Sequence, residues 1–106
     1  MRRSALGNES FDNSPHERHE EIEERSAKAR LAAKLNELIE KRGLNQTEVA
    51  DITGMTQPKV SQISRYHLHN ISLERLMQAL VSLDQHVEII VRPARLEHLA
   101  GITVAG

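Results

Sequence analysis

Cysteine is absent from this 106-residue chain, which excludes both a disulfide framework and a zinc site built from thiolates. Aromatic residues are almost as scarce, because Phe11 and Tyr66 are the only two. A core must therefore consist of aliphatic side chains and Met, which favours helices packed on one another. No apolar run approaches the roughly 20 residues that span a bilayer, and the first residues lack the apolar region of a signal peptide. We expect one small cytoplasmic domain with no membrane partner.

A large excess of positive charge is also missing, since the net charge is −1. The strongly basic balance of many nucleic-acid-binding domains is thus not present. Residues 44–85 contain only Lys59, Arg65 and Arg75 as basic side chains. Each neutralised phosphate adds to the affinity for DNA, so a single copy would bind DNA weakly. A DNA-binding function therefore requires a dimer.

The stretch 45–66 has the pattern of two short helices joined by a tight turn. Asn45 followed by Glu48 is a capping box for the first helix, and Gly54 suits its left-handed end. Thr56 can cap the second helix. The pattern predicts that the second helix exposes a polar side formed by Gln57, Lys59, Ser61, Gln62, Ser64 and Arg65.

Further helices are predicted on both sides of this motif, and together they form a helical domain over 14–85. A long first helix is expected over 15–42, starting after Ser14 and ending at Gly43. A last helix begins after Ser72 and closes the core with Leu residues at helical spacing.

The two ends of the chain differ from the helical domain. Residues 1–13 lack periodicity and predict a flexible arm. Residues 86–93 are rich in β-branched side chains and predict a strand, followed by a tail over 94–106. A single strand cannot satisfy its own backbone, so it pairs either with 102–104 or with a second chain. We favour pairing across a dimer, through Val87, Ile89, Ile90 and Val91.

Three runs of the motif carry a recognisable pattern: Gln46-Thr47-Glu48-Val49-Ala50, Gly54-Met55-Thr56-Gln57 and Lys59-Val60-Ser61. They resemble the helix-turn-helix of lambda-repressor-type regulators, the XRE family, and the resemblance extends from about Leu31 to Pro93. The chain is similar to the HigA-like subgroup, the antitoxins of type II toxin–antitoxin modules. One departure is visible, because Tyr66 stands where such proteins often have Gly. The resemblance implies a mainly α, lambda-repressor-like bundle with a C-terminal strand that pairs across a dimer.

The same resemblance implies the function. Such a protein binds double-stranded operator DNA, represses its own operon as a homodimer and neutralises a cognate ribonuclease-type toxin. In the DNA complex the second motif helix lies in the major groove, where Gln57 suits adenine and Lys59 suits guanine. The resemblance further implies that Gln46 braces Gln57. The predicted DNA-binding residues are Gln46, Thr56, Gln57, Lys59, Ser61, Gln62, Arg65 and Asn70.

An acidic segment in the first half of the long helix is the candidate surface for a small basic toxin of the HigB or RelE type. It consists of Glu20, Glu21, Ile22, Glu23 and Glu24. Two alternatives remain open at this point. The chain could be a plain transcriptional repressor whose acidic segment only aids solubility, or an interaction module that has lost DNA binding.

No pattern in the chain predicts an enzyme, a cofactor or a metal site. His16 and His19 do not form the H-E-x-x-H arrangement of zinc proteases, and His67 and His69 have no further ligand fixed by spacing. No paired nucleophile and base and no glycine-rich phosphate loop is present. We therefore expect a non-enzymatic protein that associates with the nucleoid through DNA.

Overall fold

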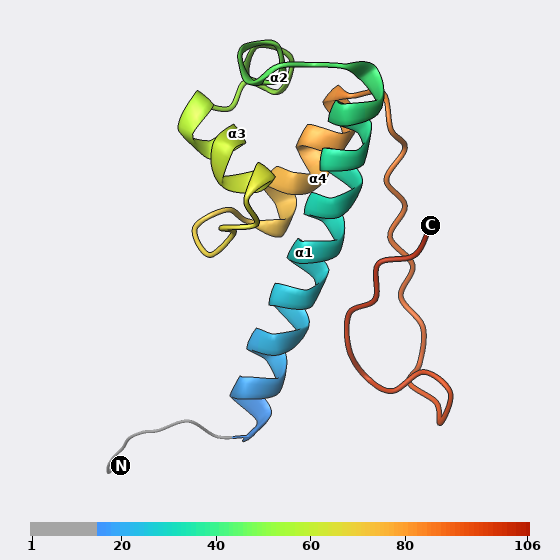
Figure 1. Cartoon of the computed structure of the whole chain (residues 1–106). Helices are drawn as coiled ribbons and strands as arrows, with labels where there is room; N and C mark the ends of the chain where they lie inside the picture. The colour runs from blue at the N-terminus through green and yellow to red at the C-terminus, as the bar shows by residue number, and fades with distance from the viewer. Residues whose placement is uncertain (1–14) are drawn as a thin grey trace, which may run out of the picture.

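The longest element is α1 (Pro15–Arg42), a 28-residue helix against which α3 and α4 pack (Figure 1). This computed structural model describes residues 15–106, with side chains from Ile22 onward. The predicted arm over 1–13 and the predicted cap Ser14 lie outside the described residues.

α1 ends at a glycine. Gly43 has φ of +64°, a left-handed conformation that a residue without Cβ adopts at little cost. Its N–H donates to the carbonyl of Glu40 at 3.1 Å, and the N–H of Leu44 donates to the carbonyl of Ile39 at 3.0 Å. These two bonds satisfy carbonyl groups of the last turn that have no partner within the helix.

α2 (Gln46–Thr53) and α3 (Gln57–Ser64) form the helix-turn-helix. The Asn45 side chain accepts from the Glu48 N–H at 2.8 Å, and the Glu48 carboxylate accepts from the Asn45 N–H at 2.9 Å. α2 ends at Gly54, which has φ of +76°. The predicted helix-turn-helix within a mainly α fold is therefore confirmed.

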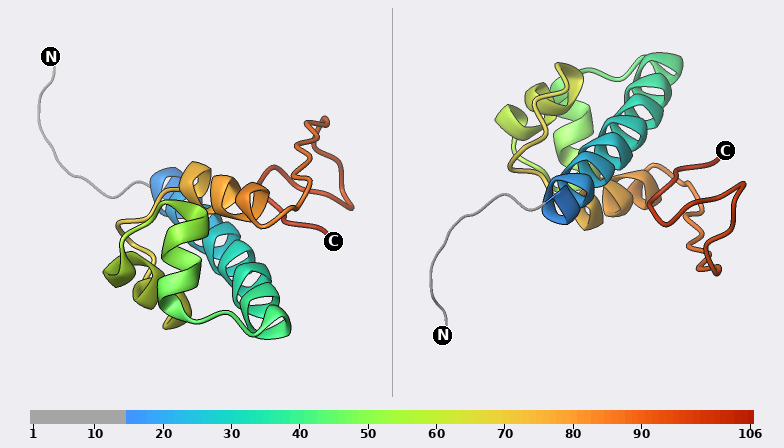
Figure 2. Two further views of the ribbon diagram at one scale, coloured as in Figure 1. Left: turned by 90° about the horizontal axis from the view of Figure 1, so that it is seen from above. Right: turned by 90° about the horizontal axis from the view of Figure 1, so that it is seen from below.

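α4 (Leu73–Ser82) lies beside the second half of α1, and α2 and α3 cover one side of this pair (Figures 1 and 2). The core between them is aliphatic. Arg42, in the last turn of α1, donates to the carbonyl of Leu83 at 2.7 Å and lies 3.6 Å from Asp84, which joins the ends of α1 and α4. The largest fully buried side chains are Leu35, Val49, Ile71, Leu76 and Leu83.

The segment after α4 does not form the predicted strand. Within residues 15–106 of this single chain no strand is present, so the expectation of a β-strand over 86–93 is wrong for the isolated chain. No backbone hydrogen bond joins 87–91 to 102–104 in the described structure. Backbone hydrogen bonds link Arg95 and His98 in both directions, at 2.8 and 3.1 Å. β-branched residues favour an extended backbone, but a strand also needs a partner, and residues 15–106 provide none in this structure.

The tail nevertheless follows α1, running along it and turning back (Figure 1). The Glu23 carboxylate accepts from the Ile102 N–H at 3.0 Å, and the Lys34 ammonium donates to the carbonyl of Gly106. Gly101 lies so close to α1 that an added Cβ would be 2.9 Å from the Glu23 carboxylate. Two side chains of α1 therefore hold the returning part of the tail.

No helix among the described residues combines the length and the apolar character that crossing a membrane requires.

Candidate nucleic-acid interface

The outer side of α3 is polar and accessible. Val60 and Ile63 point into the core with 3% and 2% of their surface exposed. This anchoring leaves Gln57 and Arg65 exposed and Lys59 partly exposed. Ser61 and Gln62 are also partly exposed on the helix. The polar residues predicted for the second motif helix are therefore accessible together.

The start of α3 contacts α2 through side chains. Gln57 Nε2 donates to Thr47 Oγ1 at 3.4 Å. The resemblance implied that Gln46 would brace Gln57, and the structure gives this role to Thr47 instead. The side chain of Gln46 is exposed at the first position of α2 and makes no hydrogen bond with the described residues. Thr47 is the next residue of α2, and its hydroxyl reaches the first residue of α3 through this bond.

The turn between α2 and α3 is fixed by a buried hydroxyl and a guanidinium. Thr53 is 8% exposed, and its hydroxyl donates to the Val49 carbonyl at 2.7 Å while accepting from the Met55 N–H at 3.2 Å. Arg75, from α4, donates to the Thr53 carbonyl at 3.3 Å. The Thr56 hydroxyl then caps α3 by accepting from the Lys59 N–H at 3.4 Å. The hydrogen bonds of Thr53, Arg75 and Thr56 therefore fix the turn that sets the angle between α2 and α3.

A side chain of α1 forms a hydrogen bond with the C-terminal end of α3. Asn36 Nδ2 donates to the carbonyl of Ile63 at 3.1 Å, across 27 residues of sequence. Ile63 lies in the last turn of α3, so this bond ties the end of α3 to α1. Sequence analysis did not single out Asn36, Thr53 or Arg75, because each acts on a residue that only the fold brings near.

Tyr66 occupies the position that closes α3. It has φ of +61°, and its N–H donates to the Ile63 carbonyl at 3.1 Å. The N–H of His67 donates to the Gln62 carbonyl at 2.8 Å. This is the same pair of bonds that ends α1 at Gly43. A tyrosine thus occupies the left-handed position after the helix, where glycine is common, and the strained backbone costs about 1 kcal/mol or more.

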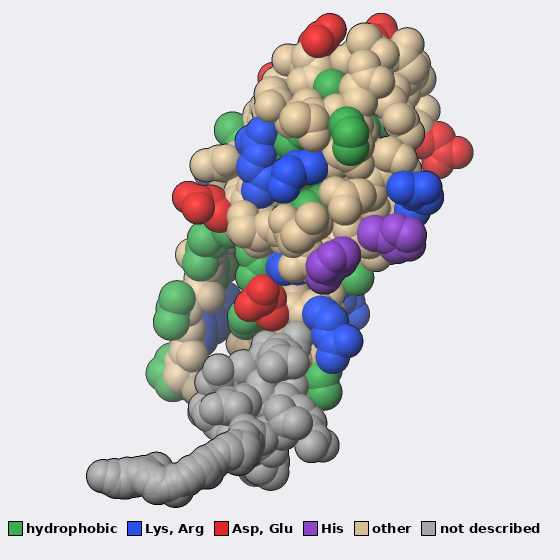
Figure 3. Space-filling model, turned by 90° about the vertical axis from the view of Figure 1, so that its left-hand side faces the viewer, with side chains coloured by type: hydrophobic (Ala, Val, Ile, Leu, Met, Phe, Trp, Pro, Cys, Tyr) green, Lys and Arg blue, Asp and Glu red, His purple; other side chains and the backbone are tan. Residues whose placement is uncertain are grey.

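The remaining predicted DNA-binding residues extend this surface. Asn70 is exposed in the loop between α3 and α4, and Arg65 is exposed at the end of α3. Figure 3 shows the face that presents α3, where Lys and Arg side chains lie beside two histidines. The face therefore offers amide, hydroxyl and cationic groups to a polar partner.

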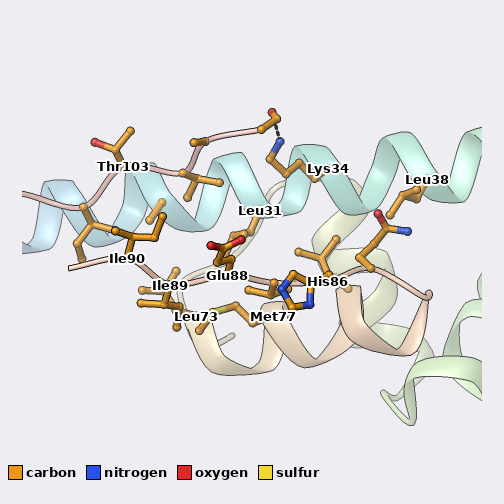
Figure 4. Close-up of a pocket in the computed structure, with 18 of the residues that line it drawn as sticks. Leu31, Lys34, Leu38, Leu73, Met77, His86, Glu88, Ile89, Ile90 and Thr103 are labelled. Atoms are coloured by element: carbon orange, nitrogen blue, oxygen red, sulfur yellow. Dashed lines mark hydrogen bonds between the residues drawn. The ribbon is translucent and has the colours of Figure 1, made fainter. Parts of the chain in front are cut away.

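The predicted dimerisation residues lie along a cavity between the tail, α1 and α4 (Figure 4). The cavity has a volume of about 800 Å³ and is open to solvent. Val87 is partly buried against the core, whereas Ile89, Ile90 and Val91 are 71%, 59% and 91% exposed. The tail therefore lies over an apolar groove without filling it.

The predicted acidic surface is described only in part. The side chains of Glu20 and Glu21 lie outside the described residues. Ile22 is 54% exposed. Glu23 holds the tail through Ile102, and Glu24 lies 3.3 Å from the Lys28 ammonium. Both described carboxylates therefore have partners within the chain. Among the residues whose positions are described, no group of three or more His, Asp or Glu could hold a metal ion.

Comparison with known proteins adds two findings. A family model described as a helix-turn-helix domain matches residues 15–92. The chain is also similar to a solved structure whose name assigns it to the XRE family of transcriptional regulators, with 44% sequence identity and a TM-score of 0.75. The similarity covers 81% of this chain and 98% of that chain. No curated protein matches the sequence.

Proposed function

The chain belongs to the helix-turn-helix domain family, and from that premise we propose that it binds operator DNA sequence-specifically and represses transcription as a homodimer. One observation carries the proposal. α3 leaves Gln57 exposed and Lys59 partly exposed, while Val60 and Ile63 of the same helix are buried. The major groove of B-DNA is wide enough to admit such a helix and presents a distinct pattern for each base pair.

Each exposed group has a role in this proposal. The Gln57 amide suits the N6 and N7 atoms of adenine, and Lys59 suits the O6 and N7 atoms of guanine. Thr47 orients the Gln57 amide through the bond at 3.4 Å. The remaining groups contact base edges or the sugar–phosphate backbone, which positions the protein: Gln46, Thr56, Ser61, Gln62, Arg65 and Asn70.

A homodimer would compensate for the small number of basic side chains that a single copy offers to DNA. Residues 87–91 lack ladder bonds in one chain, and Ile89 and Val91 are 71% and 91% exposed. Antiparallel pairing of two such segments, through Val87, Ile89, Ile90 and Val91, would satisfy the free backbone groups and cover these side chains. It would also present two copies of α3 to one duplex, which doubles the phosphate contacts.

The test selects a duplex from a random-sequence library and measures its retardation by variants. We expect Gln57→Ala combined with Lys59→Ala to abolish retardation while the helical circular dichroism spectrum is retained. Lys41→Ala, which removes an exposed lysine from the last turn of α1, is the matched control and should bind as the wild type does. Unchanged retardation by the double variant would support an interaction module in place of a DNA-binding repressor.

A second candidate role is that of an antitoxin, which the resemblance to HigA-like proteins suggests. One feature favours it. The first turns of α1 project beyond the bundle, and Ile22 is 54% exposed among glutamates (Figure 1). An exposed apolar side chain within an acidic segment suits a small basic ribonuclease toxin.

Co-expression with the adjacent gene tests this role. We expect a small basic protein to co-purify with the chain, and Ile22→Asp to release it while DNA binding is retained. Absence of any co-purifying product would leave a plain repressor of the XRE family as the function.

A further inference from the structure

The extended segment after α4 is anchored at its start and open along the rest of its length. The N–H of Gln85 donates to the Leu80 carbonyl at 3.0 Å, and the partly buried Val87 packs against the core. Beyond this anchor, the backbone of residues 88–92 makes no hydrogen bond with another described residue. The segment therefore starts at a defined position after α4, while its own backbone groups are available to a partner.

The two faces of this segment differ in character, because successive side chains of an extended backbone point to opposite faces. One face is apolar and continues from Val87. The other face carries Glu88, Ile90 and Arg92, so that an acid and a base lie two residues on either side of a central isoleucine. Glu88 and Arg92 are exposed, and neither forms an ion pair with a described residue.

This order of charges is complementary to itself when the segment is reversed. In an antiparallel pair of two copies centred on Ile90, Glu88 of one copy lies opposite Arg92 of the other, and the two-fold axis repeats the pair. Opposite charges at directly opposed positions stabilise such a pair, whereas like charges destabilise it. A centre shifted to Ile89 would place Glu88 opposite Ile90 and leave its charge unmatched.

The returning part of the tail does not offer the same match. Residues 101–106 contain no charged side chain. They are held on α1 through Glu23 and Lys34. Pairing of residues 88–92 with 102–104 would leave both charges of the segment without an opposite charge. The charge pattern therefore fits a second copy of this chain.

The groove between the tail, α1 and α4 accommodates the apolar face of such a pair. Its lining includes Leu31 and Leu38 of α1 and Leu73 and Met77 of α4 (Figure 4). Three of these side chains are only partly buried, the exception being Leu31. An antiparallel pair with one apolar face and one charged face is typical of sheets that cover a core on one side and meet water on the other.

We propose that residues 88–92 of two copies pair antiparallel in a register centred on Ile90, in which Glu88 and Arg92 form two symmetric ion pairs that select a second copy as the partner. The inference rests on the homodimer proposed above and specifies its register. Segments without this order of charges would place an unmatched or like charge opposite Glu88 or Arg92, which disfavours them as partners. The register also fixes how the two bundles lie relative to each other, and hence the separation of the two α3 helices.

Charge reversal tests the register in the full chain, with the dimer dissociation constant measured by sedimentation velocity without DNA. Glu88→Arg and Arg92→Glu each place like charges opposite each other twice, so each should raise the constant about tenfold or more. Both substitutions in one chain restore opposite charges and should return the constant to within about threefold of the wild-type value. Glu97→Arg, in the exposed tail, is the matched control and should keep the wild-type constant.

Two further measurements use the same segment. A mixture of Glu88→Arg and Arg92→Glu chains should form a heterodimer, because opposite charges then face each other at both positions. Glu88→Gln removes the attraction without adding repulsion, so it should raise the dissociation constant by only about threefold.

A single cysteine measures the register independently of charge. The natural chain has no cysteine, and Ile90 lies opposite its own copy in the proposed register, so oxidation of Ile90→Cys should link two chains through a disulfide. Leu96→Cys, at a tail position that is 93% exposed, is the control and should remain largely unlinked.

Wild-type dissociation constants in both charge-reversal variants, or a double variant weakened by both effects together, would overturn the register and leave the homodimer intact. An intrachain disulfide in Ile90→Cys with Thr103→Cys, where Ile90→Cys alone links no chains, would overturn it in favour of pairing within one chain. A wild-type chain that stays monomeric would refute the register and the homodimer together. DNA binding is judged separately, by retardation of the selected duplex.

Discussion

The helical bundle and the tail both contain many apolar residues, but the bundle buries most of the large ones, whereas the tail leaves most of its own exposed. Leu76 and Leu83 in the bundle are fully buried, whereas Val91 and Leu96 in the tail are 91% and 93% exposed. Every helix of the bundle ends in a residue that satisfies its last carbonyls. The tail has no helix or strand, and its backbone bonds include a pair between Arg95 and His98 and contacts with Glu23 and Lys34 of α1. The bundle therefore specifies its own fold, and the tail contains hydrophobic surface that a single chain does not cover.

This difference fits the two tasks of the proposed repressor. A rigid bundle is needed to hold α3 at a fixed angle, and Asn36 and Arg75 contribute to that rigidity from α1 and α4. An uncovered extended segment is needed to meet a second copy. Exposed apolar segments of this kind are typical of interaction surfaces.

The largest effect is expected in the bundle. Leu76→Ala should lower the free energy of unfolding by about 2–5 kcal/mol, because Leu76 is fully buried and its truncation leaves a cavity. Val91→Ala, in the tail, should change it by less than about 0.5 kcal/mol. Urea unfolding followed by circular dichroism measures both. A loss of several kcal/mol in Val91→Ala would show that the tail is part of the monomer core.

The next effect concerns association. Ile89→Asp should yield a monomer and weaken DNA binding about tenfold or more, since each protomer then binds its half-site alone. Its stability should remain close to that of the wild type, because Ile89 is 71% exposed. Sedimentation velocity gives the mass, and retardation of the selected duplex gives the affinity. Glu88→Gln serves as the control in the same segment, and a dimer that persists in Ile89→Asp would place dimerisation elsewhere.

The smallest effect concerns backbone strain. Tyr66→Gly should stabilise the bundle by no more than about 1 kcal/mol, because relief of the left-handed conformation is offset by the greater freedom of glycine in the unfolded chain. Asp84→Gly is the matched comparison, since Asp84 has φ of +66° at the end of α4. Aspartate tolerates this conformation better than tyrosine, so its gain should be smaller. A clear destabilisation in Tyr66→Gly would mean that contacts of the phenol outweigh the strain.

Local signals predicted the helix boundaries well. Gly43 and Gly54 are readable as helix ends because only glycine adopts positive φ without strain, and Asn45, Thr56 and Ser72 are readable as caps. Tyr66 ends α3 in the same left-handed conformation in which Gly43 ends α1, but tyrosine has no local preference that would predict this conformation. The exposed side of α3 followed from the helical spacing of Val60 and Ile63.

Contacts between distant residues were not predictable in this way. Asn36 and Ile63 are 27 residues apart, and Arg75 and Thr53 are 22 residues apart, so their hydrogen bonds depend on how the helices pack. The bond between Gln57 and Thr47 depends on the angle between α2 and α3. The tail shows a different limit, because β-branched residues indicate an extended backbone but do not provide its partner.

The stoichiometry of the wild-type chain on its selected duplex tests the central claim most directly. Sedimentation equilibrium of the complex should give the mass of one duplex with two chains, with the protected base pairs falling in two equal half-sites one helical turn apart or a multiple of it. A single chain bound to one unrepeated site would contradict the account.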